Sequence, residues 1–157
     1  MPRGHFRLED NDTCPLVMVS AGTGITPILS MIDCLALSPN KNPDRKIISI
    51  QVNRSSEYHP MKTHIDTLVK NKLLAEAHVF YTRDCNGMES NLPHTTMHSG
   101  RPSVESLQGI IGDDVGKAEF YFCGPIAFMK AFEEILGDLG IAKNKMHCER
   151  FGPELGN

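Results

Sequence analysis

Residues 15–32 read PLVMVSAGTGITPILSMI, and two periodicities meet within them. The run 15–20 is apolar, as expected of a short strand that is buried on both faces. After Gly22 and Gly24, apolar residues recur at helical spacing over 28–35. The stretch therefore predicts a strand, a glycine turn and a helix in succession.

The turn itself has the chemistry of an anion site. Gly22 and Gly24 allow a ligand to approach the backbone closely, and free N–H groups at a helix start favour an anion. Thr26 is predicted to cap the helix, with Pro27 at its first position. The dinucleotide pattern GxGxxG is incomplete, because Pro27 stands at the third glycine, and the lysine of a Walker loop is absent. Two interpretations stay open: phosphate binding, or a turn that serves packing alone.

Strand and helix patterns alternate along the rest of the chain. This alternation predicts an α/β fold, a doubly wound parallel five-stranded sheet with helices on both faces. Residues 83–102 are polar and rich in turn formers, which predicts a long loop, and Ser103 is expected to cap the short helix after it. Gly140 stands where the C-terminal cap of the last helix belongs. The five predicted strands are 15–20, 46–52, 77–82, 118–123 and a short one around 145–149.

A second glycine corner, Gly124-Pro125, follows the strand 118–123. Both corners come directly after strands, and ligands of such sheets bind beyond the carboxyl ends of the strands. We therefore expect the two corners to face one crevice. Cys123 is predicted to expose its thiol there, beside a helix start that would lower the thiol pKa. The alternative is a buried small residue that ends a strand.

Composition excludes several classes. The chain has 157 residues and a net charge of -3, which fits one domain and gives no reason to expect nucleic acid or an anionic membrane as partner. The first residues lack the apolar core of a signal peptide, and no apolar run approaches the ~20 residues of a membrane span. Five scattered cysteines without a CxxC pair fit a cytoplasmic protein. The histidines lack metal-ligand spacing, so no metal site is predicted.

Three segments carry a family resemblance: SAGTGITPILSMI, FYFCGPIAFMKAFEEILGDLG and MHCERFGPEL. In this order they resemble the NAD(P)-binding domain of the ferredoxin–NADP reductase superfamily, and within it the reductase end of flavohaemoglobins. NRSSEYHPM at 53–61 is similar to the flavohaemoglobin segment after the second strand. Residues 1–12 resemble the end of an FAD-binding barrel or a linker, and 13–157 would form the NAD(P)-binding reductase domain.

The resemblance implies roles for individual residues. The first turn would meet the pyrophosphate and nicotinamide side of NAD(P)H, and the segment after the second strand would lie near the adenosine ribose. The second corner would flank the nicotinamide, and Phe151 would cover the flavin ring with Glu149 close to the same face. The implied catalytic residues are Cys123, Glu149 and Phe151; the implied cofactor-binding residues are Gly22, Thr23, Gly24, Thr26, Pro27, Arg54, Ser55 (with Glu57 as a helper), Cys123, Gly124, Pro125, Phe128, Met129 and Phe151.

Structural alternatives stand beside these roles. Arg54 could be a solvated surface charge, and Phe151 could pack the C-terminal tail. Phe128 and Met129 lie on the apolar stripe of a helix, so they could belong to the core. If Arg54 does bind the cofactor, its guanidinium suits a 2′-phosphate, which favours tolerance of NADPH.

The implied activity is hydride transfer from NAD(P)H to FAD, followed by single-electron transfer to haem and oxidation of nitric oxide to nitrate. The FAD-binding barrel and the globin are absent from these 157 residues. FAD would thus be held by a barrel in cis or by a separate flavoprotein, haem would belong only to a full-length flavohaemoglobin, and turnover by this chain alone should be negligible. The alternatives are a nucleotide-binding module without turnover, and a reductase component of the cytochrome b5 reductase or oxygenase kind.

Overall fold

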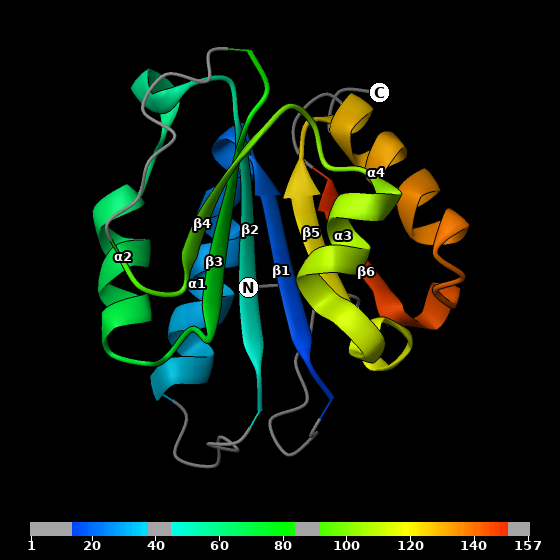
Figure 1. Ribbon diagram of the computed structural model, residues 1–157, viewed down its shortest axis with the longest axis horizontal. Coiled ribbons are helices and arrows are strands. Elements are labelled where there is room, and N and C mark those ends of the chain that lie inside the picture. Colours follow the sequence, from blue (N-terminus) through cyan, green and yellow to red (C-terminus); the bar gives the residue numbers. More distant parts are fainter. Residues whose placement is uncertain (1–13, 38–44, 84–91, 151–157) are drawn as a thin grey trace.

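The structure, a computed structural model, describes residues 14–37, 45–83 and 92–150. A six-stranded sheet in the order β4-β3-β2-β1-β5-β6 forms its centre (Figure 1). Every neighbouring pair of strands is parallel. The strands are β1 (Leu16–Ala21), β2 (Ile47–Asn53), β3 (Glu76–Tyr81), β4 (Thr95–Ser99), β5 (Glu119–Gly124) and β6 (Met146–Arg150), and the α-helices are α1 (Ile25–Leu37), α2 (Lys62–Lys70), α3 (Val104–Ile111) and α4 (Ile126–Asp138).

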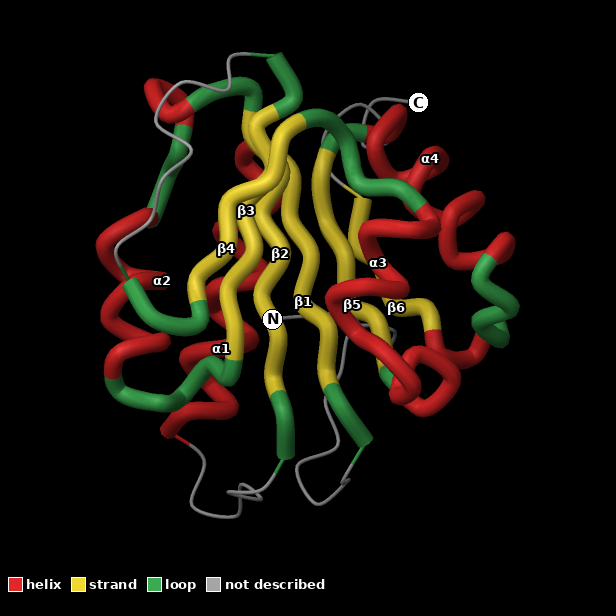
Figure 2. Tube along the Cα trace, in the orientation of Figure 1, coloured by secondary structure: helices red, strands yellow, loops and turns green. Residues whose placement is uncertain are grey.

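Two apolar cores lie on the two faces of the sheet. On one face, Val19 and Phe122 pack with Phe132 of α4, and α3 contributes to the same core. On the other face, Met18 packs with Ile28 of α1, and α2 contributes there. Figure 2 shows the strands between these two helical layers. Because both faces are covered, all six residues of β1 are buried, which explains its unbroken apolar sequence.

The predicted fold class is confirmed: the sheet is parallel, and helices cover both of its faces. The predicted loop over 83–102 is wrong for Thr95–Ser99, which pairs with β3 as a sixth strand. β4 ends the sheet, and none of its residues is fully buried. An edge strand of this kind needs no apolar pattern, so TTMHS gave no strand signal.

The helix boundaries follow the predicted capping chemistry in two of three cases. The Ser103 side chain accepts from the Ser106 N–H in a reciprocal capping box at the start of α3. Gly140, with φ of +82°, follows α4 in the left-handed conformation typical of a helix end. The third case is wrong: Thr26 does not cap α1, because the helix starts at Ile25 and a 3₁₀ turn precedes it. Pro27 is accordingly the third residue of α1 and not the first.

Some predictions fall outside the described residues. The barrel remnant at 1–12 and Phe151 lie there, and only the backbone of Glu149 is described, within β6. Within the described ranges, no helix combines the length and the apolar character that crossing a bilayer requires.

Candidate nucleotide-binding cleft

The two glycine corners meet at the carboxyl ends of β1 and β5. The chain winds from β1 outward to β4 and then returns to β5, so the winding reverses between β1 and β5. Gly24 lies so close to β5 that a Cβ atom there would be 2.1 Å from the carbonyl oxygen of Cys123 and 2.8 Å from the nitrogen of Gly124. Only glycine fits this approach. The predicted convergence of the two corners is therefore confirmed.

Gly22 and Gly124, the other two glycines of the corners, are required for different reasons. Gly22 has φ of +56°, a left-handed conformation that glycine adopts without strain. At Gly124, a Cβ atom would lie 2.8 Å from the ring of Phe128 and 3.0 Å from the Cβ of Ala21. The absence of a side chain here lets α4 begin directly beside β1.

A cleft of about 630 Å³ opens at this edge of the sheet, and its size is ordinary for a small-molecule site. Ala21 and Gly22 line it from β1 and its turn, Val52 and Asn53 from β2, and Pro125 from the second corner. Each lies at or just after a strand end. The cleft thus occupies the position where doubly wound sheets bind their ligands.

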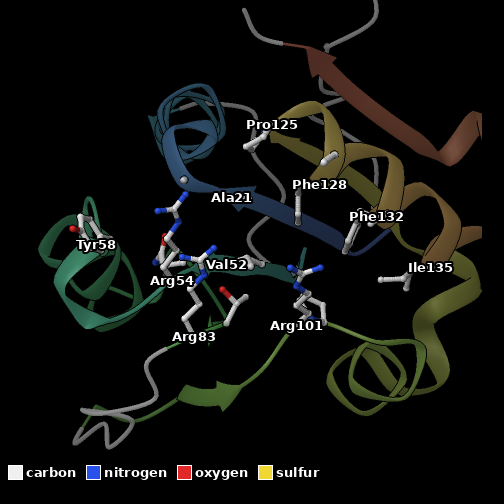
Figure 3. A pocket seen from close by; sticks show the side chains of 16 residues that line it. Ala21, Val52, Arg54, Tyr58, Arg83, Arg101, Pro125, Phe128, Phe132 and Ile135 are labelled. Carbon is white, nitrogen blue, oxygen red and sulfur yellow. The ribbon is translucent and has the colours of Figure 1, made fainter.

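Three arginines line the cleft: Arg54 after β2, Arg83 after β3, and Arg101 after β4. Figure 3 shows them on the side opposite the aromatic residues of α4. None of the described residues lining the cleft is acidic, although the chain as a whole carries a net charge of -3. The positive charge is therefore concentrated where an anionic ligand would lie.

One face of α4 forms the apolar wall of the cleft, opposite the arginines. Phe128, Phe132 and Ile135 lie at helical spacing along it (Figure 3). The rings of Phe128 and Phe132 are stacked with their centroids 5.6 Å apart. A wall of this kind offers apolar contact to a flat aromatic ligand. The guanidinium groups on the other side of the cleft suit phosphate.

Comparison with known proteins identifies the family. The chain matches the family described as "Oxidoreductase NAD-binding domain" over residues 18–134. The chain belongs to this family. The matched range contains both glycine corners, and it includes all three arginines of the cleft.

Relatives of this NAD-binding domain include flavohaemoproteins. A flavohaemoprotein of Bacillus cereus is 36% identical over 97% of this chain, and the chain spans 36% of that protein. A solved structure of the flavohaem-like FAD/NAD-binding domain of nitric oxide dioxygenase from Vibrio cholerae matches with a TM-score of 0.76 and 25% identity, over 97% of this chain and 56% of that one. Flavohaemoglobin from Malassezia yamatoensis, solved with FAD and haem bound, matches with a TM-score of 0.68 and 30% identity, over 89% of this chain and 32% of that one.

Only part of the predicted site of this NAD-binding domain lines the cleft. Gly22, Arg54, Pro125 and Phe128 line it. Met129 is 3% exposed and belongs to the core, as its place in the apolar stripe allows. The other predicted residues within the described ranges do not line the cleft: Thr23, Thr26 and Glu57 are exposed, Pro27 is half-buried, and Gly24, Ser55 and Gly124 are buried. Their cofactor-binding roles stay predictions.

Cys123 differs from its predicted environment. Its thiol is fully buried, so the prediction of an exposed thiol is wrong. The side chain belongs to the core on the α1 and α2 face, whereas the cleft adjoins α4. Its backbone is the part that lies at the site, where its carbonyl touches Gly24. The position of Glu149 beside it follows from the register, since the two are Cα partners in β5 and β6.

Residues missed by sequence analysis complete the cleft. Arg83, Arg101 and Tyr58 line it. The two arginines belong to no motif, and Tyr58 lies in the segment 53–61, where the resemblance gave it no role. Their common signal is position: each follows the end of a strand by a few residues. Among the described residues, no group of three His, Cys, Asp or Glu side chains is arranged to hold a metal ion.

A partly buried hydrogen-bond network fixes the segment that carries Arg54 and Tyr58. Gln51 Nε2 donates to the Pro60 carbonyl at 2.8 Å, so Gln51 Oε1 faces the ring of His59 at 3.1 Å. Because that oxygen only accepts, Nε2 of His59 carries the proton, and Nδ1 accepts from the Tyr81 hydroxyl at 2.9 Å. Burial and the nearby Lys62 ammonium lower the pKa of His59. The neutral ring therefore ties the loop to the sheet.

Proposed function

We propose that the cleft binds NAD(P)H. The observation that carries this proposal is the contact of Gly24 with the Cys123 carbonyl, which joins the two corners at the mouth of an arginine-lined cleft. The 3₁₀ turn Gly22–Gly24 leads directly into α1, and the Ile25 N–H donates back to the carbonyls of Gly22 and Thr23. The N–H groups left without intrahelical partners are therefore those at the start of this turn. Together with the arginines, these groups suit the pyrophosphate of a dinucleotide.

The residues present also fit the rest of the dinucleotide. The apolar face of α4 is suited to an aromatic ring, and the buried amide of Asn53 offers hydrogen bonds within the cleft. When bound, the reduced nicotinamide supplies a hydride, that is, one proton and two electrons, and is left as NAD(P)⁺. The protein's own part is to orient the dinucleotide and to exclude water, and this task requires no acid or base from its side chains.

The hydride acceptor in this proposal is a flavin held outside the chain. The chain spans 36% of the Bacillus cereus flavohaemoprotein, and the Malassezia flavohaemoglobin carries FAD and haem. We therefore assign the chain as the reductase end of a flavohaemoglobin-type nitric oxide dioxygenase, with an FAD-binding barrel as its partner in cis. Electrons would pass from the flavin to haem, and nitric oxide would be oxidised to nitrate.

The arginines favour NADPH within this assignment. Arg54 and Arg83 follow neighbouring strands and both line the cleft. A guanidinium pairs with a phosphate through two parallel hydrogen bonds. A 2′-phosphate on the adenosine ribose would meet this charge, whereas the plain hydroxyl of NADH would not use it.

Titration of the chain with NADH and NADPH tests the proposal. We expect a saturable change in nicotinamide fluorescence with both, and tighter binding of NADPH. Lys70→Ala is the matched control for removing an arginine from the cleft, because Lys70 is an exposed cation on α2 outside the cleft. This variant should bind both nucleotides as the wild type does. With added FAD and a dye acceptor, turnover should be negligible. The absence of a saturable response to either nucleotide would refute the proposed function.

A further inference from the structure

The carboxyl end of β2 carries a buried amide that has no hydrogen-bond partner among the residues that the structure describes. Asn53 is 5% exposed, and neither Oδ1 nor Nδ2 of its side chain has a hydrogen-bond partner within the described residues. Its backbone carbonyl accepts from the Thr82 N–H at 2.8 Å. The unmet hydrogen-bonding capacity lies in the side-chain oxygen and nitrogen.

An amide in this state lowers the stability of the folded protein, because burial removes its hydrogen bonds to water and the protein supplies none in their place. Two hydroxyls among the described residues share the condition, Ser20 Oγ and Thr95 Oγ1. Neither of those residues lines the cleft, whereas Asn53 does. A ligand in the cleft would thus meet Asn53 and would satisfy what the protein leaves open.

The chemistry of the amide differs from that of its neighbours. Arg54 and Arg83 are donors only, so they suit phosphate oxygens. The Asn53 side chain presents an acceptor and a donor side by side, which complements a ligand group that both donates and accepts. A sugar hydroxyl and the edge of adenine have this character, and a phosphate does not.

The position of Asn53 selects one half of the dinucleotide. β2 lies between β1, which carries the first glycine corner, and β3, which leads to Arg83. Arg54, the next residue in the chain, and Arg83 both line the cleft and meet the 2′-phosphate of the adenosine ribose in the proposed function. The adenosine half would thus extend over β2 and β3.

We propose that Asn53 recognises the adenosine half of the bound dinucleotide through a paired donor and acceptor. This inference rests on the proposed function of the cleft. It makes Asn53 a binding residue whose unsatisfied amide lowers the stability of the free protein and contributes to affinity.

The substitution Asn53→Leu tests this, since leucine has a similar branched shape but no polar atoms. If the amide serves binding, the Kd for NADPH and for ADP should rise about tenfold, as expected for lost hydrogen bonds. At the same time the melting temperature of the free chain should rise by about 3 °C, because an unpaired polar group is removed. A structural role would give a lower melting temperature and unchanged affinity, and this result would overturn the inference.

Ser20→Ala is the matched control. It removes another unpaired buried group, but one that does not line the cleft. Its melting temperature should not fall, and its Kd for NADPH should equal that of the wild type. A loss of affinity equal to that of Asn53→Leu would show a general effect of the sheet and would overturn the assignment to Asn53.

Two analogues identify the group that Asn53 recognises. If it is a sugar hydroxyl, it must be the 3′-hydroxyl, which NADH and NADPH share; wild type should then bind 3′-deoxy-ADP about tenfold more weakly than ADP. If it is the adenine edge, inosine diphosphate should be weakened instead. In either case Asn53→Leu should no longer discriminate. If wild type discriminates against neither, the paired donor and acceptor is refuted. If wild type binds neither NADPH nor NADH, the proposed function fails as well, whereas equal binding by wild type and Asn53→Leu overturns only this inference.

Discussion

The contact between the two glycine corners can be broken by one methyl group. In Gly24→Ala, the new Cβ would lie 2.1 Å from the Cys123 oxygen, 2.5 Å from its carbonyl carbon and 2.8 Å from the Gly124 nitrogen. All three atoms are backbone, so no side-chain rotation relieves the clash. The oxygen would have to move by at least 1.3 Å to reach an ordinary contact of 3.4 Å.

The magnitude follows from what must move. β5 pairs with both β1 and β6, so its backbone is held on two sides. Overpacking in a rigid core costs about 1–3 kcal/mol, and we expect Gly24→Ala to lie at the upper end, about 3 kcal/mol. A displacement of this size is larger than the spread of ordinary hydrogen-bond lengths. Hydrogen bonds between the displaced corner and the dinucleotide would therefore break, and affinity for NADPH should fall by at least about tenfold.

Gly109→Ala is the matched control for this change. Gly109 lies on an exposed position of α3, and a Cβ there would meet nothing within 4 Å. Alanine should stabilise that helix by about 0.8–1 kcal/mol, so the same substitution is expected to have the opposite sign. Urea unfolding measures both free energies, and fluorescence titration measures NADPH binding. Wild-type stability and affinity in Gly24→Ala would refute the reasoning.

Three further outcomes follow from the structure. Arg54→Ala and Arg83→Ala should each raise the Kd for NADPH about tenfold or more and that for NADH much less, because a phosphate gains charge-assisted hydrogen bonds; in titrations of both nucleotides, equal losses would contradict the phosphate assignment. Burial and the Lys62 charge lower the pKa of His59, so its contribution to stability is complete above the unfolded value of about 6.5 and is lost as the pH falls through the lower folded pKa. Urea unfolding at pH about 7.5 and about 5.5 should therefore show a smaller decline for His59→Gln than for wild type, and identical declines would count against this account. Ser103→Ala should cost about 1 kcal/mol in urea unfolding by removing the capping box of α3 while NADPH affinity stays unchanged; a loss of affinity would show that the helix start contributes to the site.

The sequence predicts most of the sheet because buried parallel strands have a strong signal. β1 is apolar on both faces because α1 and α4 cover both, and Gly140 ends α4 with the conformation that glycine favours. β4 gave no such signal, since its residues lie at the edge of the sheet. The start of α1 was misplaced because a 3₁₀ turn extends it backward, and this depends on how Gly22–Gly24 packs against β5.

The candidate site is harder to predict, since it depends on which strand ends become neighbours. Gly22 and Gly124 stand out because a glycine directly after a buried strand predicts a turn at the ligand-binding edge of the sheet. Arg83 and Arg101 belong to no motif and reach one cleft only because β3 and β4 are adjacent. The face of the sheet toward which the Cys123 side chain points also depends on how β5 sits in the sheet. In the structure its thiol lies in the core beneath α1 and α2.

The location of the bound nucleotide tests the central claim most directly. Backbone amide NMR spectra of the chain, recorded with increasing NADPH, report which residues sense the ligand. The account predicts saturable shifts at Gly22, Gly24, Arg54 and Arg83, with little change at the amino ends of the strands. Shifts confined to other surfaces, or none at saturating NADPH, would contradict it.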